Sequence, residues 1–280
     1  MTSVAMVLAV LRVRLQRLSP SAGLGFGLLA LIVLAALLSP LSGYPVGADV
    51  DATARDLSPS AAHWMGTDHL GRDVFWRWVL ASRAFVGPGF AAVGLALSIG
   101  VSLGAWAGFV GGVVSNAIRF VLGSVASLPT LVFVLLFCTI YGAGTWQLAT
   151  SAGIAAAPAI AQTVHDRVDA LKRSEFVLAA QAHGVPLGRL LLAHLVGAGA
   201  GPAIVRQGLA TFGQFVVLEC TLSYLGGFGV PEPQPSWGNM LVFDWGRTLG
   251  LSVTAPALAI WATVAATVAA GTAFAEEEDG

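Results

Sequence analysis

Long windows with almost no charged side chains limit what this chain can fold into. A helix needs about 20 mainly apolar residues to cross a hydrocarbon core about 30 Å thick. Only 10% of the 280 residues are charged and 56% are hydrophobic, which is too apolar for the surface of a water-soluble globule. We therefore predict an all-α, polytopic membrane protein with six transmembrane helices. The predicted spans are residues 22–41, a helix within 84–118, and about 120–141, 146–164, 207–224 and 249–274.

The segments outside these spans predict one six-span domain at residues 22–275. Residues 1–21 are expected to form a lead-in helix on the cytoplasmic surface, because their arginines follow a short apolar run, whereas those of a secretion signal precede it. The six-span domain contains an outer loop at 42–83, an inner loop at 165–206 and an outer strap at 226–248, and an acidic cytoplasmic tail follows at 276–280.

The distribution of basic residues predicts the orientation of the chain. Six spans place both termini on the same side of the membrane. With the termini in the cytoplasm, nine of the 14 lysines and arginines fall on the inner side and five on the outer side. Since positive charge accumulates on the cytoplasmic side, we expect cytoplasmic N- and C-termini and an inner loop that faces the cytoplasm.

Several classes of function are excluded by what the sequence lacks. The net charge of −1 gives no sign of nucleic-acid binding. There is no glycine-rich phosphate loop, no acidic cluster for magnesium and no series of intramembrane carboxylates for a proton relay. Cys138 and Cys220 fall in or at the end of predicted spans, so we expect packing residues rather than a disulfide or a zinc site. We expect no catalytic, cofactor or metal site here, so if the protein moves a solute uphill, the energy must come from another chain.

The inner loop carries a helix signal at residues 175–184. Glu175 follows Ser174, a suitable N-cap, and Gly184 suits the position that ends a helix. Ala179 and Ala180 leave little side-chain bulk, so a partner protein could approach the backbone closely. Two interpretations stay open: a helix that docks to a partner, or an ordinary cytoplasmic helical hairpin.

The outer loop contains a second polar motif. Its glycines suit turns, and its charged residues can cap helices or pair with one another. A metal site made from His63, Asp68, His69 and Asp73 is the less favoured alternative, because capping explains the same residues. The members of the motif are Gly66, Thr67, Asp68, Gly71, Arg72 and Asp73.

The fifth predicted span carries polar residues within the membrane. Glu219 is an intramembrane carboxylate, which either anchors the span to the outer strap or contacts substrate. Four further side chains fall within about 80° of one another around the helix, and this stripe either lines a solute path or bonds neighbouring helices. They are Gln207, Thr211, Gln214 and Thr221.

Prolines and tryptophans give further expectations. Pro129 and Pro158 each remove a backbone hydrogen bond from a predicted span and are expected to kink it. Trp237 and Trp245 in the outer strap suit the membrane interface.

The helix signal resembles the EAA loop of bacterial ABC-type import permeases, in the variant of the dipeptide, oligopeptide and nickel permease family. Glu175, Ala179, Ala180 and Gly184 match that loop, although Gly197 stands where the family has proline. Further matches follow the family order over roughly residues 10–275. They are residues 65–73, the Leu128-Pro129 pair, and residues 219–229 and 235–241.

This resemblance implies a C-type permease subunit of a binding-protein-dependent, ATP-driven importer in the bacterial cell membrane, with di- or oligopeptides as the expected substrate. Its expected partners are a second, related but different permease, one or two cytoplasmic ATPase subunits that bind ATP and magnesium, and an extracytoplasmic binding protein. The family's docking helix inserts into the ATPase. Import of a nickel chelate or haem by the same architecture is an alternative. An ion-coupled secondary transporter is another, and it would need intramembrane ionisable groups, of which Glu219 comes nearest.

Overall fold

The computed structural model of the chain describes residues 19–47, 49–175, 177, 179, 183–184, 201–244 and 250–274. Within these residues every regular element longer than an isolated bridge is helical, which confirms the all-α prediction. Residues 1–18 of the predicted lead-in helix, the acidic tail and most of the inner loop after Glu175 lie outside the described residues, while residues 19–21 form the N-cap and the beginning of the first described helix.

Four helical segments are long and apolar enough to cross a membrane, and they contain the first, second, fifth and sixth predicted spans. The second comprises two helices, α3 (Val74–Leu80) and α4 (Arg83–Val110), and ends at Gly111, which has a φ of +69°. The others are α2 (Pro20–Leu38) with the short 3₁₀ helix η1 (Ser39–Ser42), α10 (Gly201–Leu225) and α12 (Leu251–Thr272).

The third predicted span is wrong as a straight helix over residues 120–141. Two helices, α5 (Gly112–Ala126) and α6 (Thr130–Tyr141), meet at an angle of 87° and make either one broken span or a re-entrant loop. The break lies at Pro129, which lacks an N–H and disfavours the helical conformation of Leu128. The expected kink at Pro129 is therefore a full change of direction.

The fourth predicted span lies inside α7 (Thr145–Lys172), which continues through Pro158 without a break. Its 28 residues have a length of about 42 Å, enough to cross a bilayer. The helix is less apolar than the four segments above, so the count of six spans stays a prediction. One further helix, α11 (Trp237–Asp244), lies in the outer strap.

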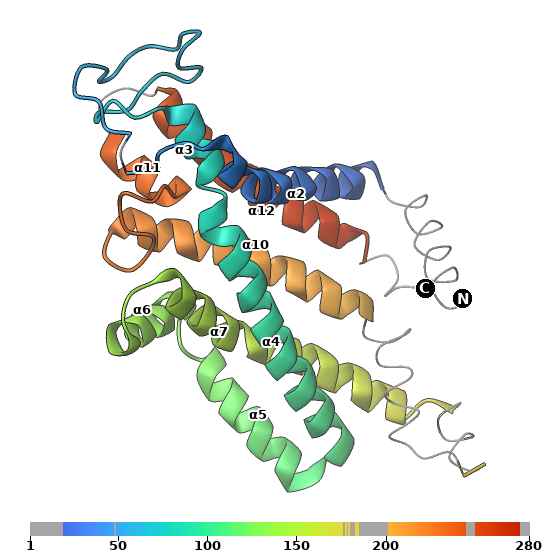
Figure 1. The fold of residues 1–280 in the computed structure, drawn as a ribbon. Coiled ribbons are helices and arrows are strands. Elements are labelled where there is room, and N and C mark those ends of the chain that lie inside the picture. The colour runs from blue at the N-terminus through green and yellow to red at the C-terminus, as the bar shows by residue number, and fades with distance from the viewer. Residues whose placement is uncertain are drawn as a thin grey trace.

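Small residues hold the helices together. Gly100, Gly104 and Gly108 face α7 at four-residue spacing, and a Cβ on Gly104 would lie 2.4 Å from the Ala161 carbonyl oxygen. Such contacts let membrane helices approach closely. Figure 1 shows α4 crossing the bundle beside α7, with α2 and α12 together on the other side of α10.

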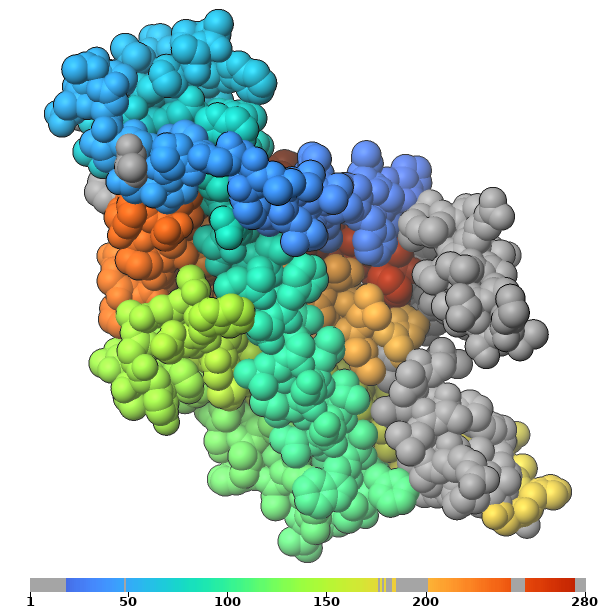
Figure 2. Space-filling model, in the orientation of Figure 1, coloured from blue at the N-terminus to red at the C-terminus, as the bar shows by residue number. Residues whose placement is uncertain are grey.

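The surface also suits a bilayer. Apolar side chains on α2 and α12 are exposed, among them Leu24 and Trp261 at 76% and 69%. The outer loop between η1 and α3 projects beyond the helices as a separate lobe (Figure 2). Helices with exposed apolar side chains therefore surround a buried core that includes Phe85, Phe215 and Leu148. Polar groups gather at the outer lobe and in the cavity described below.

Candidate functional site

The motif in the outer loop folds into a compact turn. Gly66 and Gly71 have φ values of +77° and +80°, and a Cβ on Gly71 would lie 1.8 Å from the Asp51 carbonyl oxygen. The Thr67 hydroxyl donates to the Ala54 carbonyl and accepts the Leu57 N–H. These positions therefore fix the path of the loop by backbone contacts.

Buried charges tie this turn to the strap. Asp68 accepts from the Arg72 Nε at 2.7 Å, and Arg72 Nη1 reaches the Glu232 carboxylate at 2.7 Å. Arg77, which is 1% exposed, donates to the same carboxylate at 3.2 Å and to the Pro233 carbonyl at 3.2 Å. We call Asp68, Arg72, Arg77 and Glu232 the outer charge cluster.

The capping interpretation fits the remaining acid of the motif better than a metal site does. Asp73 caps α3 by accepting the Trp76 N–H at 3.1 Å, and its other oxygen contacts His63 Nδ1 at 2.8 Å. Asp68 is engaged by Arg72. Across the part of the chain that the structure describes, no group of three His, Cys, Asp or Glu side chains is placed to hold a metal ion.

Glu219 is completely buried between α10 and the strap. Its carboxylate accepts the Ser223 hydroxyl at 2.7 Å and lies 3.4 Å from the Cys220 sulfur. Ser223 in turn accepts the Val230 N–H of the strap at 2.8 Å. This arrangement supports the anchoring interpretation of Glu219. Both cysteines, Cys138 and Cys220, are buried and free.

Trp237 differs from its expected place at the membrane interface. It is 3% exposed, its ring lies 4.7 Å from that of Phe85, and its Nε1 donates to the Trp78 carbonyl. The strap is therefore packed onto α3 and α4. Trp245 lies outside the described residues.

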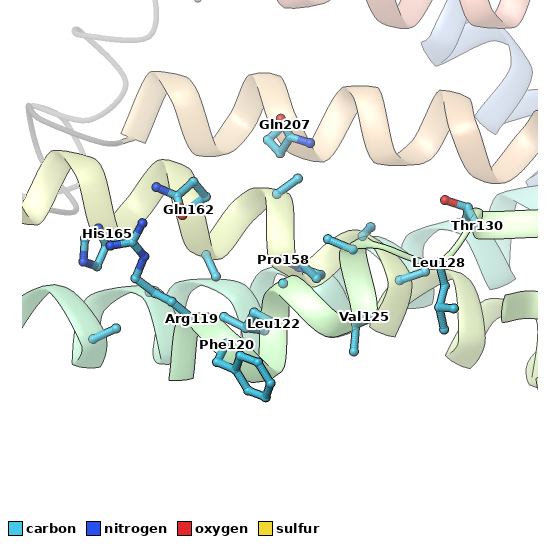
Figure 3. Close-up of a pocket in the computed structure, with 18 of the residues that line it drawn as sticks. Arg119, Phe120, Leu122, Val125, Leu128, Thr130, Pro158, Gln162, His165 and Gln207 are labelled. Carbon is cyan, nitrogen blue, oxygen red and sulfur yellow. The ribbon is translucent and has the colours of Figure 1, made fainter. Parts of the chain in front are cut away.

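The polar stripe on α10 divides into two parts. Gln207 and Gln214 line a cavity of about 810 Å³ between α4, α5, α7 and α10, which we call the inner cavity (Figure 3). Thr211 is 2% exposed and its hydroxyl donates to the Gln207 carbonyl, while Thr221 donates to the Val217 carbonyl. Neither threonine lines the cavity. The two glutamines are thus the stripe residues in position to meet a solute.

Other residues of the inner cavity lay beyond the sequence-based prediction. Asn116 and Arg119 come from α5, and Gln162 and His165 come from α7. Arg77 and Glu232 of the outer charge cluster were also missed. The available signals were a basic residue four positions after Asp73 and an acid that stands between two prolines in the strap.

The predicted docking helix is described only in part. Glu175 and Ala179 are helical and exposed, and Val177 between them is 1% exposed. Gly184 has a φ of +80°, as a helix-ending glycine requires. Ser174 donates its hydroxyl to the Leu171 carbonyl at 2.7 Å. Ala180 lies outside the described residues, so the docking helix stays a prediction.

Comparison with known proteins places these features in a family. Residues 100–276 match the model of the binding-protein-dependent transport system inner membrane component. The chain is 34% identical over 232 residues to an oligopeptide transport system permease protein of Bacillus subtilis, covering 83% of this chain and 74% of that protein.

Two further relatives carry other substrates in their names. A dipeptide transport system permease protein of Alkalihalophilus pseudofirmus is 31% identical over 217 residues, covering 78% of this chain and 71% of the relative. A nickel transport system permease protein of Escherichia coli is 32% identical over 260 residues, covering 90% and 92%. The chain therefore belongs to the binding-protein-dependent inner-membrane transport components, as an ABC importer permease of the dipeptide, oligopeptide and nickel group.

Proposed function

We propose that this chain is the non-catalytic permease subunit of an importer for di- or oligopeptides, which forms the solute path together with a second, related permease. ATP and magnesium bind to cytoplasmic ATPase subunits, and an extracytoplasmic binding protein delivers the solute. Import of a nickel chelate or haem is the second candidate, because one relative is named for nickel transport. In this proposal the chain lies in the cell membrane with both termini in the cytoplasm.

The observation that carries the proposal is the exposed helical start at Glu175 and Ala179, with Gly184 in the left-handed conformation. This segment follows α7, and residues of α7 between positions 155 and 165 line the inner cavity. ATP binding would close the ATPases around the helix at residues 175–184, and α7 would transmit that motion to the cavity. On the outer side, the outer charge cluster holds the loop and the strap in a fixed arrangement, and the binding protein docks on this surface.

A secondary transporter is less well supported. A transporter driven by a cation gradient would need a carboxylate in the path to bind the driving ion. Glu219 is the intramembrane carboxylate of the described spans, and it is 0% exposed, bonded to Ser223 and absent from the inner cavity.

Coupling is tested at Gly184. Because its φ is +80°, leucine should disrupt the turn, whereas asparagine tolerates this conformation. We expect Gly184→Leu to abolish binding-protein-stimulated ATP hydrolysis in the reconstituted complex and Gly184→Asn to retain most of it, with membrane insertion unchanged in both. Stimulation of the leucine variant at the parental level would remove the coupling role.

The identity of the complex is tested by native purification. Detergent-solubilised chain should retain an ATPase subunit, and mass spectrometry of the solute on the co-purified binding protein should find a peptide. Absence of any ATPase would contradict the importer proposal, and a nickel chelate or haem on the binding protein would favour the second candidate.

A further inference from the structure

The inner cavity is lined by amide and basic side chains. Its described lining contains no acidic residue. The amide and basic members are Asn116, Arg119, Gln162, His165, Gln207 and Gln214. Figure 3 shows Arg119 extending from α5 toward His165 and Gln162 on α7. The cavity is therefore a space of mixed polar and apolar lining whose permanent charge is positive.

Arg119 brings a charge that no described acid of the chain pairs with. No ion pair among the described residues includes it, and its side chain is exposed. Asp166, the acid nearest in sequence to the cavity wall, is engaged through one oxygen by Gln162 at 2.7 Å and by His165 at 3.2 Å, and it is not part of the lining. Arginine keeps its charge at all ordinary pH values.

A charged side chain within a membrane segment is costly, so it normally faces a water-filled cavity and marks a solute or ion pathway. Arg119 satisfies this condition, because it lies in the bent helix pair that counts as a candidate span and it faces a cavity of about 810 Å³. Cavities of about 300–1,000 Å³ hold small organic ligands. The space thus fits a small peptide.

A second cavity, at the other end of α4 and α7, also has an arginine in its lining. It has a volume of about 500 Å³ and lies against the strap, and Arg83 is the charged residue of its described lining. The beginning of α4 and Trp146 at the start of α7 line this outer cavity, whereas Gly104 and His165 line the inner one. Gly87 and Gly104, one from each lining, are about 25 Å apart along α4.

We propose that the path selects solutes that carry a carboxylate, and that Arg119 binds this carboxylate in the inner cavity after Arg83 attracts it at the outer one. The inference rests on the proposed import function and narrows its substrate class. A guanidinium forms bidentate hydrogen bonds with a carboxylate, such as the C-terminus of a peptide. A bare nickel cation would meet two positive charges and no acidic ligand in either described lining.

The charge preference of the cavity can be measured without transport. In a parent protein with Cys138→Ala, Cys220→Ala and Asn116→Cys, the introduced thiol would sit in the inner cavity. Its labelling rate is compared for negatively charged sulfonatoethyl and positively charged trimethylammonioethyl methanethiosulfonate. Because a charged cleft raises the local concentration of counter-ions at least about tenfold, Arg119→Gln should lower the anion-to-cation rate ratio by about that factor.

Two control variants test whether the change in rate ratio depends on the charge at position 119. Arg119→Lys keeps the charge and should keep the ratio, and Arg55→Gln removes an exposed arginine of the outer loop that lines neither cavity. A ratio for Arg119→Gln within twofold of the parent would overturn the proposal. So would loss of the second permease from the purified Arg119→Gln complex, because the arginine would then be an interface residue.

Transport provides the second measurement, in proteoliposomes that contain the whole complex and the binding protein with the peptide found on it. Arg119→Gln should lower uptake of this peptide by about tenfold or more. Uptake by the variant at the parental level would overturn the role of Arg119 but would leave the proposed import function standing. A parent complex that hydrolyses ATP without moving solute would instead contradict the proposed import function.

Discussion

At the scale of single residues, the outer face is stabilised by charges that are almost completely removed from water. Asp68, Arg72 and Arg77 are 7%, 3% and 1% exposed, and Glu232 lies between the two arginines. Burial by itself lowers the pKa of Arg72, but Asp68 and Glu232 outweigh burial and raise that pKa above its ordinary value. Buried charges of this kind are tolerated only when each has a partner. The cluster therefore holds the loop and strap in one arrangement.

Removing the charge of Glu232 should weaken this arrangement. In Glu232→Gln the carboxylates that remain near the buried Arg77 are those of Asp49 and Asp68, each 3.9 Å away. We expect the free energy of unfolding to fall by about 1–3 kcal/mol, which is less than for a fully buried ion pair because Glu232 is partly exposed. Thermal unfolding in detergent measures it. Arg55→Gln, at an exposed arginine of the same loop, should unfold at the parental midpoint. Equal midpoints for both variants would show that the cluster contributes nothing.

At the scale of helices, the approach of α4 to α7 depends on which glycines face the neighbour. A Cβ on Gly104 would lie 2.4 Å from a backbone oxygen of α7, whereas nothing lies within 4 Å of one on Gly94 in the same helix. The two glycines therefore form a matched pair with opposite surroundings.

Gly104→Ala should push the two helices apart and destabilise the protein by about 1–3 kcal/mol. Gly94→Ala should be neutral or stabilise α4, because alanine favours a helix by about 1 kcal/mol over glycine. The unfolding midpoints of the two variants give the comparison. Similar destabilisation at both positions would show that loss of glycine itself, rather than contact with α7, is responsible.

The helices themselves show what a sequence can and cannot reveal. The end of α4 at Gly111 was predictable from local backbone preferences. The 87° turn at Pro129 was not, because a proline only frees backbone groups, and the surrounding packing determines how far the helix bends. The chain has 34 glycines, and the sequence does not show which of those in α4 contact another helix until the position of that helix is known.

The candidate site likewise has features that the sequence reveals and features that only the fold reveals. Glu219 and the turn at residues 66–73 stand out in the sequence, because an acid in a span and a glycine-rich charged loop are unusual locally. The pairing of Arg77 with Glu232 joins positions 155 residues apart, and the inner cavity is lined from α4, α5, α7 and α10 and by the first residue of α6. Such long-range contacts leave no periodic pattern, so the geometry had to come from the fold.

At the scale of the whole molecule, the topology depends on α7. If this helix crosses the membrane, its exposed ends at Trp146 and Arg173 lie on opposite sides. The strap packs beside Trp146 in the outer cavity, and Lys172 donates to the carbonyls that end α4. The first end thus lies on the side of the strap and the second on the side of the inner loop, as the predicted six spans require.

Cysteine labelling decides between six spans and fewer. In the background of Cys138→Ala and Cys220→Ala, single changes Trp146→Cys and Arg173→Cys are exposed to a membrane-impermeant maleimide in intact cells. We expect Trp146→Cys to react at once, together with an outer-loop control, Asp51→Cys, and Arg173→Cys to react only after permeabilisation. If both ends of α7 react from the same side, the helix does not cross, and the inner cavity then opens to a single face. The reverse order would place both termini outside the cell and separate the docking helix from any cytoplasmic ATPase.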